Sequence, residues 1–104
     1  MEKFGLSQRN IKIIIDILAK YPEIESAIIY GSRAKGNYRI GSDIDLTFKG
    51  KNLTDKTLSR IWHDLDDSDS PYLFDLSIYH HLTHQPFIDH IDRVGKIFYQ
   101  REDK

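Results

Sequence analysis

The sequence contains no cysteine, which excludes disulfide bonds and any metal site built on thiolates. It also lacks a long apolar run, since none approaches the roughly 20 residues that a membrane-spanning helix needs. The opening residues have no apolar core of the kind found in signal peptides. We therefore expect a cytoplasmic protein that makes no contact with a membrane.

Charge of one sign is not in excess either. The chain has 15 lysines and arginines against 16 aspartates and glutamates, and its formal net charge is −1. It has no strongly basic field to attract nucleic acid, so we expect no nucleic-acid partner. A length of 104 residues with 39% hydrophobic content suits one domain over residues 1–104, built around one core.

Apolar periodicity predicts helices interspersed with strands. Ser7 is a candidate cap for a helix over 8–20, and Thr54 is one for a helix over 55–66. The apolar face of this second helix comprises Leu58, Ile61, Trp62 and Leu65. The other expected elements are strands over 24–30, 42–49 and 72–79, a helix over 86–94 and an edge strand in KIFYQ. This order predicts an α/β (α+β) fold, in which helices pack on a small mixed sheet.

Two aspartates stand inside an apolar run, in the stretch SDIDLTF. Residues two apart in a strand point to one face, so Asp43 and Asp45 lie on the same face, about 6.5 to 7 Å apart. Asp75 is a lone acid in the later strand YLFDLSIY. If the two strands are neighbours, one face presents three carboxylates, whose repulsion a divalent cation relieves. Mg²⁺ prefers such oxygen ligands.

A glycine and a serine follow the buried strand and begin a basic loop. Gly31 lets the backbone approach a ligand closely, and Ser32 offers a hydroxyl. The next residues favour a short helical turn, whose free N–H groups attract phosphate. Arg33, Lys35 and Arg39 add positive charge within reach of a triphosphate, although a solvated basic loop is an equal alternative. The commoner glycine-rich nucleotide motifs are absent, which disfavours a dinucleotide fold.

The stretch GSRAKGNYRIGSDIDL resembles the signature of the DNA polymerase β-like nucleotidyltransferase superfamily: a Gly-Ser turn followed by Asp-x-Asp. The residue pattern of this motif and the small size of the chain resemble those of the minimal nucleotidyltransferases, the MNT antitoxins encoded beside helical HEPN partners. The resemblance covers Tyr30 to Leu46, and Asp75 matches the third acid of the superfamily by its position.

The resemblance implies a role for each matching residue. Asp43, Asp45 and Asp75 become catalytic residues and ligands of Mg²⁺, with two ions expected, and Asp75 is the third ligand or the general base. The implied nucleotide-binding residues are Gly31, Ser32, Arg33, Lys35, Arg39 and Ser42. The implied reaction transfers a nucleoside monophosphate, with ATP as the expected donor, to a hydroxyl of a HEPN-type partner protein.

Larger members of the superfamily carry further domains that hold the base and the acceptor, for which 104 residues leave no room. We therefore expect a partner chain or a dimer mate to supply this recognition, in a homodimer or a hetero-oligomer.

Other interpretations remain open at this point. The chain is alternatively a catalytically silent subunit that binds a nucleotide or a partner, or an enzyme that acts on a small-molecule or RNA acceptor. The aspartates also have ordinary structural roles, as turn formers at a strand end or as partners of an arginine. The cluster of His80, His81 and His84 either binds a transition metal or consists of scattered surface residues.

Overall fold

The computed structural model describes residues 3–39 and 41–102, so that Ile40 lies outside the described part of the motif. The elements are α1 (Gln8–Leu18), β1 (Ser26–Tyr30), α2 (Ser32–Lys35), β2 (Ile44–Lys49), α3 (Asp55–Asp66), β3 (Phe74–Ile78), the 3₁₀ helix η1 (Tyr79–His81), α4 (Gln85–Val94) and β4 (Lys96–Gln100). Each predicted helix and strand is present, with bounds that differ by a few residues. Tyr79 is a correction, because it begins η1 instead of ending β3. No helix within the described ranges is long and apolar enough to cross a membrane.

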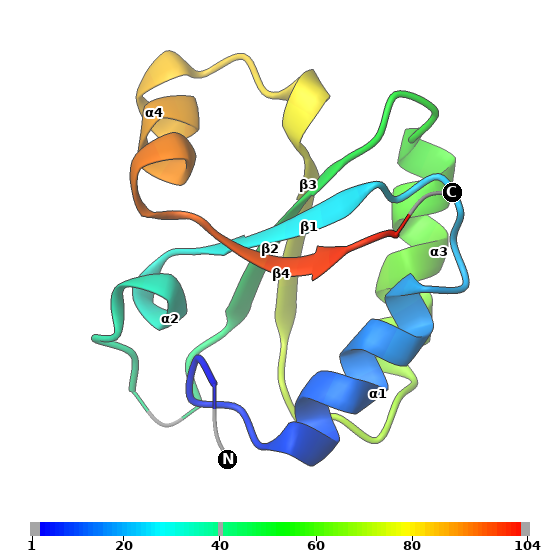
Figure 1. The fold of residues 1–104 in the computed structure, drawn as a ribbon, viewed down its shortest axis with the longest axis vertical. Helices are drawn as coiled ribbons and strands as arrows, with labels where there is room; N and C mark the ends of the chain where they lie inside the picture. The colour runs from blue at the N-terminus through cyan, green and yellow to red at the C-terminus, as the bar shows by residue number, and fades with distance from the viewer. Residues whose placement is uncertain (1–2, 40, 103–104) are drawn as a thin grey trace.

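The strands form one four-stranded mixed sheet in the order β3-β2-β1-β4 (Figure 1). Strand β1 runs antiparallel to both β2 and β4, whereas β2 and β3 are parallel. Parallel neighbours need a crossover connection, and α3 supplies it between β2 and β3. Strands β3 and β4 form the two edges, as predicted for β4. The predicted fold class is confirmed.

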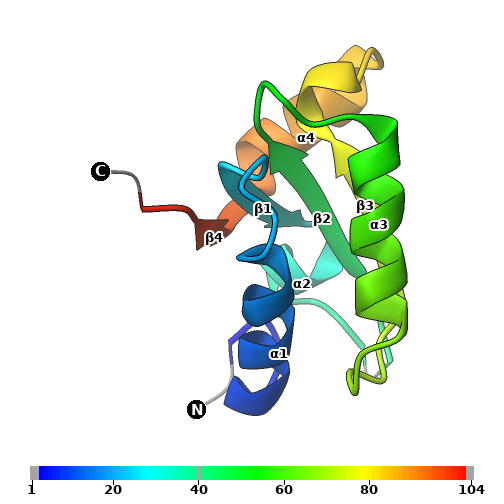
Figure 2. The same ribbon diagram turned by 90° about the vertical axis from the view of Figure 1, so that its right-hand side faces the viewer.

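The two predicted helix caps are both formed. The Ser7 hydroxyl accepts a hydrogen bond from the backbone N–H of Asn10 at 3.2 Å, and the Thr54 hydroxyl accepts one from Thr57 at the same distance. Each bond satisfies a backbone N–H group that has no partner within the helix. These caps fix the starts of α1 and α3, the helices that lie side by side in Figures 1 and 2.

The main core lies between one face of the sheet and the helices α1 and α3. It includes Ile14 and Leu18 of α1, Ile61 and Leu65 of α3, and the strand residues Ala27, Ile29, Ile44, Leu46 and Phe48. Trp62 departs from the prediction that it belongs to this apolar face, because 41% of its surface is exposed. The opposite face of β1 is covered by α4, which packs Ile91 against Ile28 and Tyr30.

Candidate active site

The sheet register brings the predicted acids of β2 and β3 together. Asp45 is the direct neighbour of Asp75 across the parallel pair, and Tyr30 is the neighbour of Asp45 on the other side. Paired residues share a face, so Tyr30, Asp45 and Asp75 belong to the face opposite the main core, which is the acidic face of the sheet. Asp45 is partly buried, whereas Asp43 and Asp75 are exposed. The condition set by the sequence, that the two strands be neighbours, is met.

The acids act on one another through their charges. Burial raises the pKa of the Asp45 carboxyl from 3.8 to about 6, and the charges of Asp75 and Asp43 add to this effect. The Arg33 guanidinium opposes it and lowers the pKa of the same group. An ionised Asp45 is therefore held in an unfavourable field, which a cation bound at this face would relieve.

The raised pKa of Asp45 predicts how stability depends on pH in metal-free buffer. A carboxyl whose pKa is higher in the folded than in the unfolded protein destabilises the fold once it ionises, so stability falls as pH rises from about 4 to about 6. Asp45→Asn removes this effect. Urea unfolding with a chelator would measure the free energy of unfolding at about pH 4.5 and about pH 7.5. Relative to the wild type, the variant should be more stable at the higher pH than at the lower pH. Asp66→Asn, on the exposed side of α3, is the control, and a difference independent of pH would contradict the prediction.

The chemistry of the donor set fits a hard divalent cation. Carboxylate oxygens from Asp43, Asp45 and Asp75 are the ligands that Mg²⁺ prefers. Within residues 3–39 and 41–102, no three His, Cys, Asp or Glu side chains lie close enough to form a complete metal site by themselves. Mg²⁺ is commonly held by one or two carboxylates together with substrate phosphates, so an incomplete protein site accords with a metal that arrives with a nucleotide.

Gly31 places the loop backbone directly against the acids. It precedes α2 with φ 77° and ψ −153°, a backbone conformation that residues other than glycine avoid. A Cβ atom added there would collide with the carboxylate of Asp45. The predicted short helical turn is confirmed as α2. The Gly-Ser turn therefore lies directly beside Asp45.

Arg33 is held inside the protein, and its assignment to nucleotide binding stays a prediction. Only 3% of its surface is exposed. Its Nη1 donates to the carbonyl of Phe4 at 2.9 Å, and its Nη2 donates to the carbonyl of Ser42 at 2.8 Å. The guanidinium also lies 5.3 Å from the ring of Tyr38 and 4.9 Å from that of Tyr72. This geometry favours a positioning role, in which Arg33 holds the loop that leads to Asp43.

Arg33→Lys should lower the free energy of unfolding by about 2 kcal/mol, because one ammonium group cannot replace the hydrogen bonds that the guanidinium donates to two separate carbonyl groups. Chemical denaturation would measure the change. Arg39→Lys is the matched control, since Arg39 is exposed in the same loop and should shift stability by less than about 0.5 kcal/mol. Equal effects of the two substitutions would contradict the positioning role.

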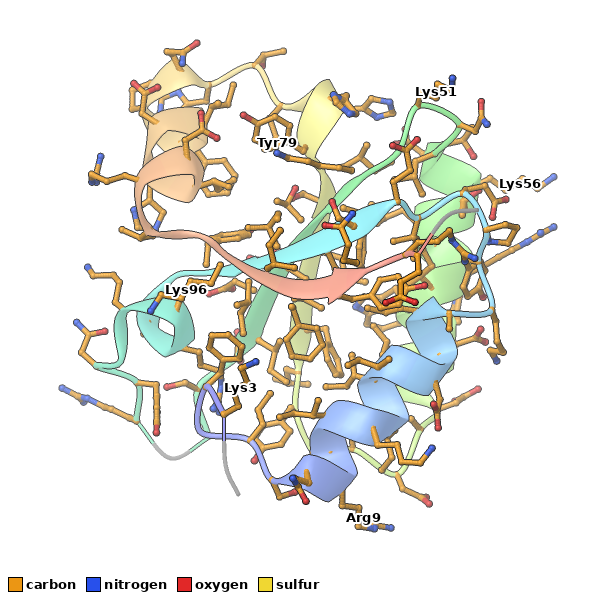
Figure 3. The ribbon with its side chains drawn as sticks, in the orientation of Figure 1. Lys3, Arg9, Lys51, Lys56, Tyr79 and Lys96 are labelled. Carbon is orange, nitrogen blue, oxygen red and sulfur yellow. The ribbon has the colours of Figure 1, made fainter. Side chains whose placement is uncertain are left out.

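Two further predicted phosphate ligands, Ser42 and Lys35, differ in their surroundings. The Ser42 hydroxyl accepts a hydrogen bond from the backbone N–H of Arg39 at 2.8 Å and so closes the turn before β2. Lys35 lines a pocket of about 480 Å³ together with Lys3 and Lys96. Figure 3 shows these last two lysines on the side of the molecule that carries α2. None of the three aspartates lines this basic pocket.

Tyr30 belongs to the acidic face and was missed by the sequence analysis. Burial raises the pKa of its hydroxyl to about 12, and the charges of Asp75 and Asp45 contribute. Its ring lies edge-on to Phe87 of α4, with centroids 5.4 Å apart. A neutral phenol thus stands next to the acids at neutral pH. Its place directly before the Gly-Ser turn was the available signal.

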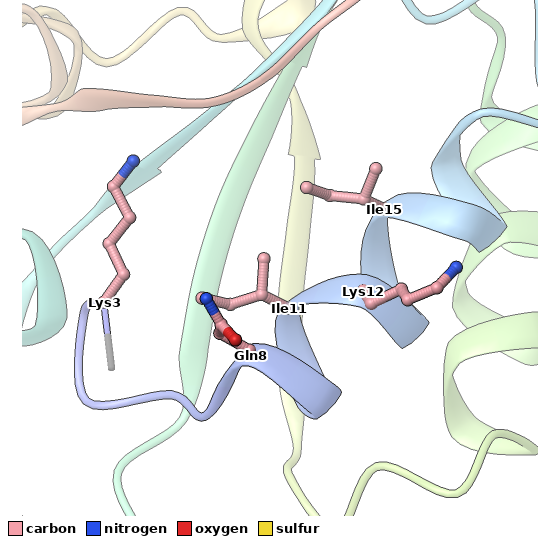
Figure 4. A pocket seen from close by; sticks show the side chains of 5 residues that line it. All are labelled: Lys3, Gln8, Ile11, Lys12 and Ile15. Atoms are coloured by element: carbon pink, nitrogen blue, oxygen red, sulfur yellow. The ribbon is translucent and has the colours of Figure 1, made fainter. Parts of the chain in front are cut away.

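Two other features lie apart from the acidic face. His81 lies 3.5 Å from Asp55, but the histidines after β3 form no metal-binding group with other described residues. A pocket of about 460 Å³ lies along α1 and is lined by Lys3, Gln8, Ile11, Lys12 and Ile15 (Figure 4). Its lining contains no acid, so neither feature competes with the strand aspartates as the candidate active site.

The family described as polymerase beta, nucleotidyltransferase matches residues 12–104. The chain belongs to this family. The matched range contains the Gly-Ser turn and all three aspartates. Members of the family typically use metal ions, in agreement with the oxygen donors of the acidic face. No curated protein sequence matches the chain closely enough to count as a relative.

Solved structures with a similar fold include antitoxins of toxin–antitoxin pairs. A toxin–antitoxin crystal structure with AMP-PNP has a TM-score of 0.73 at 19% identity, covering 89% of this chain and 75% of the other. A tri-AMPylated Shewanella oneidensis HEPN toxin in complex with MNT antitoxin gives 0.68 at 18%, covering 90% and 72%. A putative nucleotidyltransferase from Sulfolobus solfataricus gives 0.53 at 22%, covering 88% and 77%. At these identities the likeness establishes the nucleotidyltransferase fold.

Proposed function

We propose that this nucleotidyltransferase-family chain transfers a nucleoside monophosphate, AMP from ATP, to a hydroxyl of a HEPN-type helical partner protein and thereby acts as an antitoxin. The observation that carries the proposal is the register of Asp45 against Asp75, directly beside the Gly31 turn. The similar structures support the choice of donor and partner, because one contains AMP-PNP and another contains an AMPylated HEPN toxin.

In this proposal, Asp43 and Asp45 hold Mg²⁺, with Asp75 as a third ligand or as the general base. When bound, two such ions would neutralise the phosphate charge and lower the pKa of the attacking hydroxyl. The Gly31-Ser32 turn binds the phosphate chain, since the first N–H groups of α2 have no partner within the helix. Lys35 and Arg39 supply positive charge from the exposed loop.

The transfer step conserves atoms and charge. The acceptor oxygen forms a bond to the α-phosphorus of ATP while the bond from that phosphorus to the oxygen bridging to the β-phosphorus breaks. Pyrophosphate leaves, and Asp75 takes the proton of the hydroxyl when it acts as the base. Asp75 is exposed at the edge strand, so an acceptor can approach it without rearrangement of the sheet.

The chain is proposed to work as one domain whose partner supplies the acceptor and part of the recognition of the base. Incubation with the protein encoded beside it, Mg²⁺ and labelled ATP tests this. Label at the α-phosphate should remain on the partner, and label at the γ-phosphate should not, because it departs with pyrophosphate. A stable complex that acquires no label would instead favour the silent binding subunit.

A further inference from the structure

A groove lies between α3 and the edge strand β3, next to the predicted base. Its volume is about 360 Å³, and its lining includes Asp55, Leu58 and Trp62 from α3 and Phe74, Asp75 and Leu76 from β3. Asp75 therefore belongs to two surfaces, the acidic face and this groove. Because the Asp75 side chain belongs to the acidic face, a chain that pairs with the edge of β3 would lie beside the residue proposed to accept the proton.

The groove runs along a free sheet edge. The carbonyl of Leu73 accepts a hydrogen bond from the backbone N–H of Ile44 at 2.9 Å, which fixes the side of the strand that faces β2. Alternate residues of a strand direct their backbone groups to the same neighbour. Phe74 and Leu76 therefore direct their N–H and C=O groups away from β2, toward the open edge. Such an edge can pair with an added strand.

Exposed apolar side chains lie in the groove and directly before β3. Trp62 lines the groove with 41% of its surface exposed, and Leu73, which directly precedes β3, is 68% exposed. These are two of the four large hydrophobic side chains exposed in the described ranges. Exposed apolar groups rimmed by polar ones mark sites of contact with other molecules, and tryptophan is a frequent anchor in them.

The charge of the groove indicates the character of its occupant. Asp55 and Asp75 are both in the lining, which contains no lysine or arginine. The Asp55 side chain is 92% exposed, and its Oδ1 lies 3.5 Å from Nδ1 of His81. Lys56, the next residue along α3, points away from the sheet in Figure 3. The groove therefore complements a positively charged segment.

We infer that this groove binds the acceptor as an extended, basic polypeptide segment that adds to the edge of β3. The inference rests on the proposed function and specifies how that function selects its substrate. Side chains alternate along a strand, so a hydroxyl residue paired opposite Asp75 would share its face. The flanking residues would then point to the other face and contact Trp62 and Leu58.

Intrinsic fluorescence tests the inference directly, because Trp62 is the only tryptophan in the sequence. The probes are blocked peptides of sequence Lys-Ala-Val-Ser-Val-Ala-Lys and Glu-Ala-Val-Ser-Val-Ala-Glu, in which the charged residues share the face of the valines and so point toward Asp55. The lysine peptide should shift the tryptophan emission to shorter wavelength in a saturable manner, and the glutamate peptide should bind at least about tenfold more weakly. Asp55→Lys, which keeps the tryptophan and changes an exposed side chain, should reduce or reverse this preference.

An emission unchanged by either peptide, or changed equally by both, would overturn the inference. A shift that depends on protein concentration without peptide would also overturn it, because a second copy of the chain would then occupy the groove. Peptide binding needs no turnover, so this outcome is distinguishable from failure of the proposed function. In the transfer assay, Trp62→Ala should raise the KM for the partner protein about tenfold and leave the affinity for Mg²⁺ and ATP unchanged. An unchanged KM would contradict the inference.

Discussion

Asp45→Asn is expected to reduce nucleotidyl transfer by about 10³-fold or more, because the proposed function makes Asp45 a charged ligand of the metal. Asparagine has nearly the same shape as aspartate, so the sheet register should persist. The raised pKa of Asp45 adds a second expectation with the opposite sign: at neutral pH and without metal, the variant should be more stable than the wild type.

This combination separates a chemical role from a structural one. Transfer of α-labelled phosphate and urea unfolding would be measured on the same preparations. Asp66→Asn serves as a control, since Asp66 is an exposed acid on α3 outside the acidic face. Transfer retained within about tenfold of the wild type would contradict the proposed role of Asp45. Loss of transfer together with loss of stability would also contradict it, because the substitution would then act through the fold.

Gly31→Ala is expected to have the next largest effect. The added Cβ would collide with the Asp45 carboxylate, and the backbone conformation at φ 77° and ψ −153° disfavours alanine. We expect the free energy of unfolding to fall by about 1–3 kcal/mol. Transfer should fall by about 10²-fold, because the turn and Asp45, the proposed metal ligand, would both be displaced. Denaturation and the transfer assay would measure the two effects.

Gly36→Ala provides a matched control at the other end of α2. Gly36 also has a positive φ, 87°, but nothing lies within 4 Å of an added Cβ atom there. Its substitution should therefore cost about 1 kcal/mol of stability and leave transfer nearly unchanged. If both substitutions reduced transfer equally, the close approach of Gly31 to Asp45 would not be the cause.

Local sequence signals predicted most of the fold. The caps Ser7 and Thr54 and the apolar periodicities act over a few residues, so they can be read without knowledge of the tertiary structure. A shared face for Asp43 and Asp45 was expected from the two-residue period of a strand and stays a prediction, because β2 begins at Ile44, directly after Asp43. The pairing of β2 with β3 joins residues far apart in the sequence, and no local pattern predicts it. The sequence analysis therefore placed Asp75 beside the other acids only if these two strands are neighbours.

The environments of individual side chains were less predictable. Arg33 resembles any loop arginine in the sequence, because its backbone partner Phe4 is 29 residues away and its two aromatic neighbours lie outside α2. Trp62 fits the helical period of α3 but lies at the margin of its apolar face, beside the edge strand β3, where it stays partly exposed. Burial of this kind depends on which elements meet, and no local pattern specifies that.

A crystal structure of the protein with Mg²⁺ and a non-hydrolysable ATP analogue would show where the metal and the nucleotide bind. We expect metal between the carboxylates of Asp43 and Asp45 and the phosphates of the analogue, with the phosphate chain on the Gly31-Ser32 turn and Asp75 facing the α-phosphorus. A nucleotide bound elsewhere, such as the basic pocket of Lys3, Lys35 and Lys96, with no metal at the aspartates, would contradict this expectation.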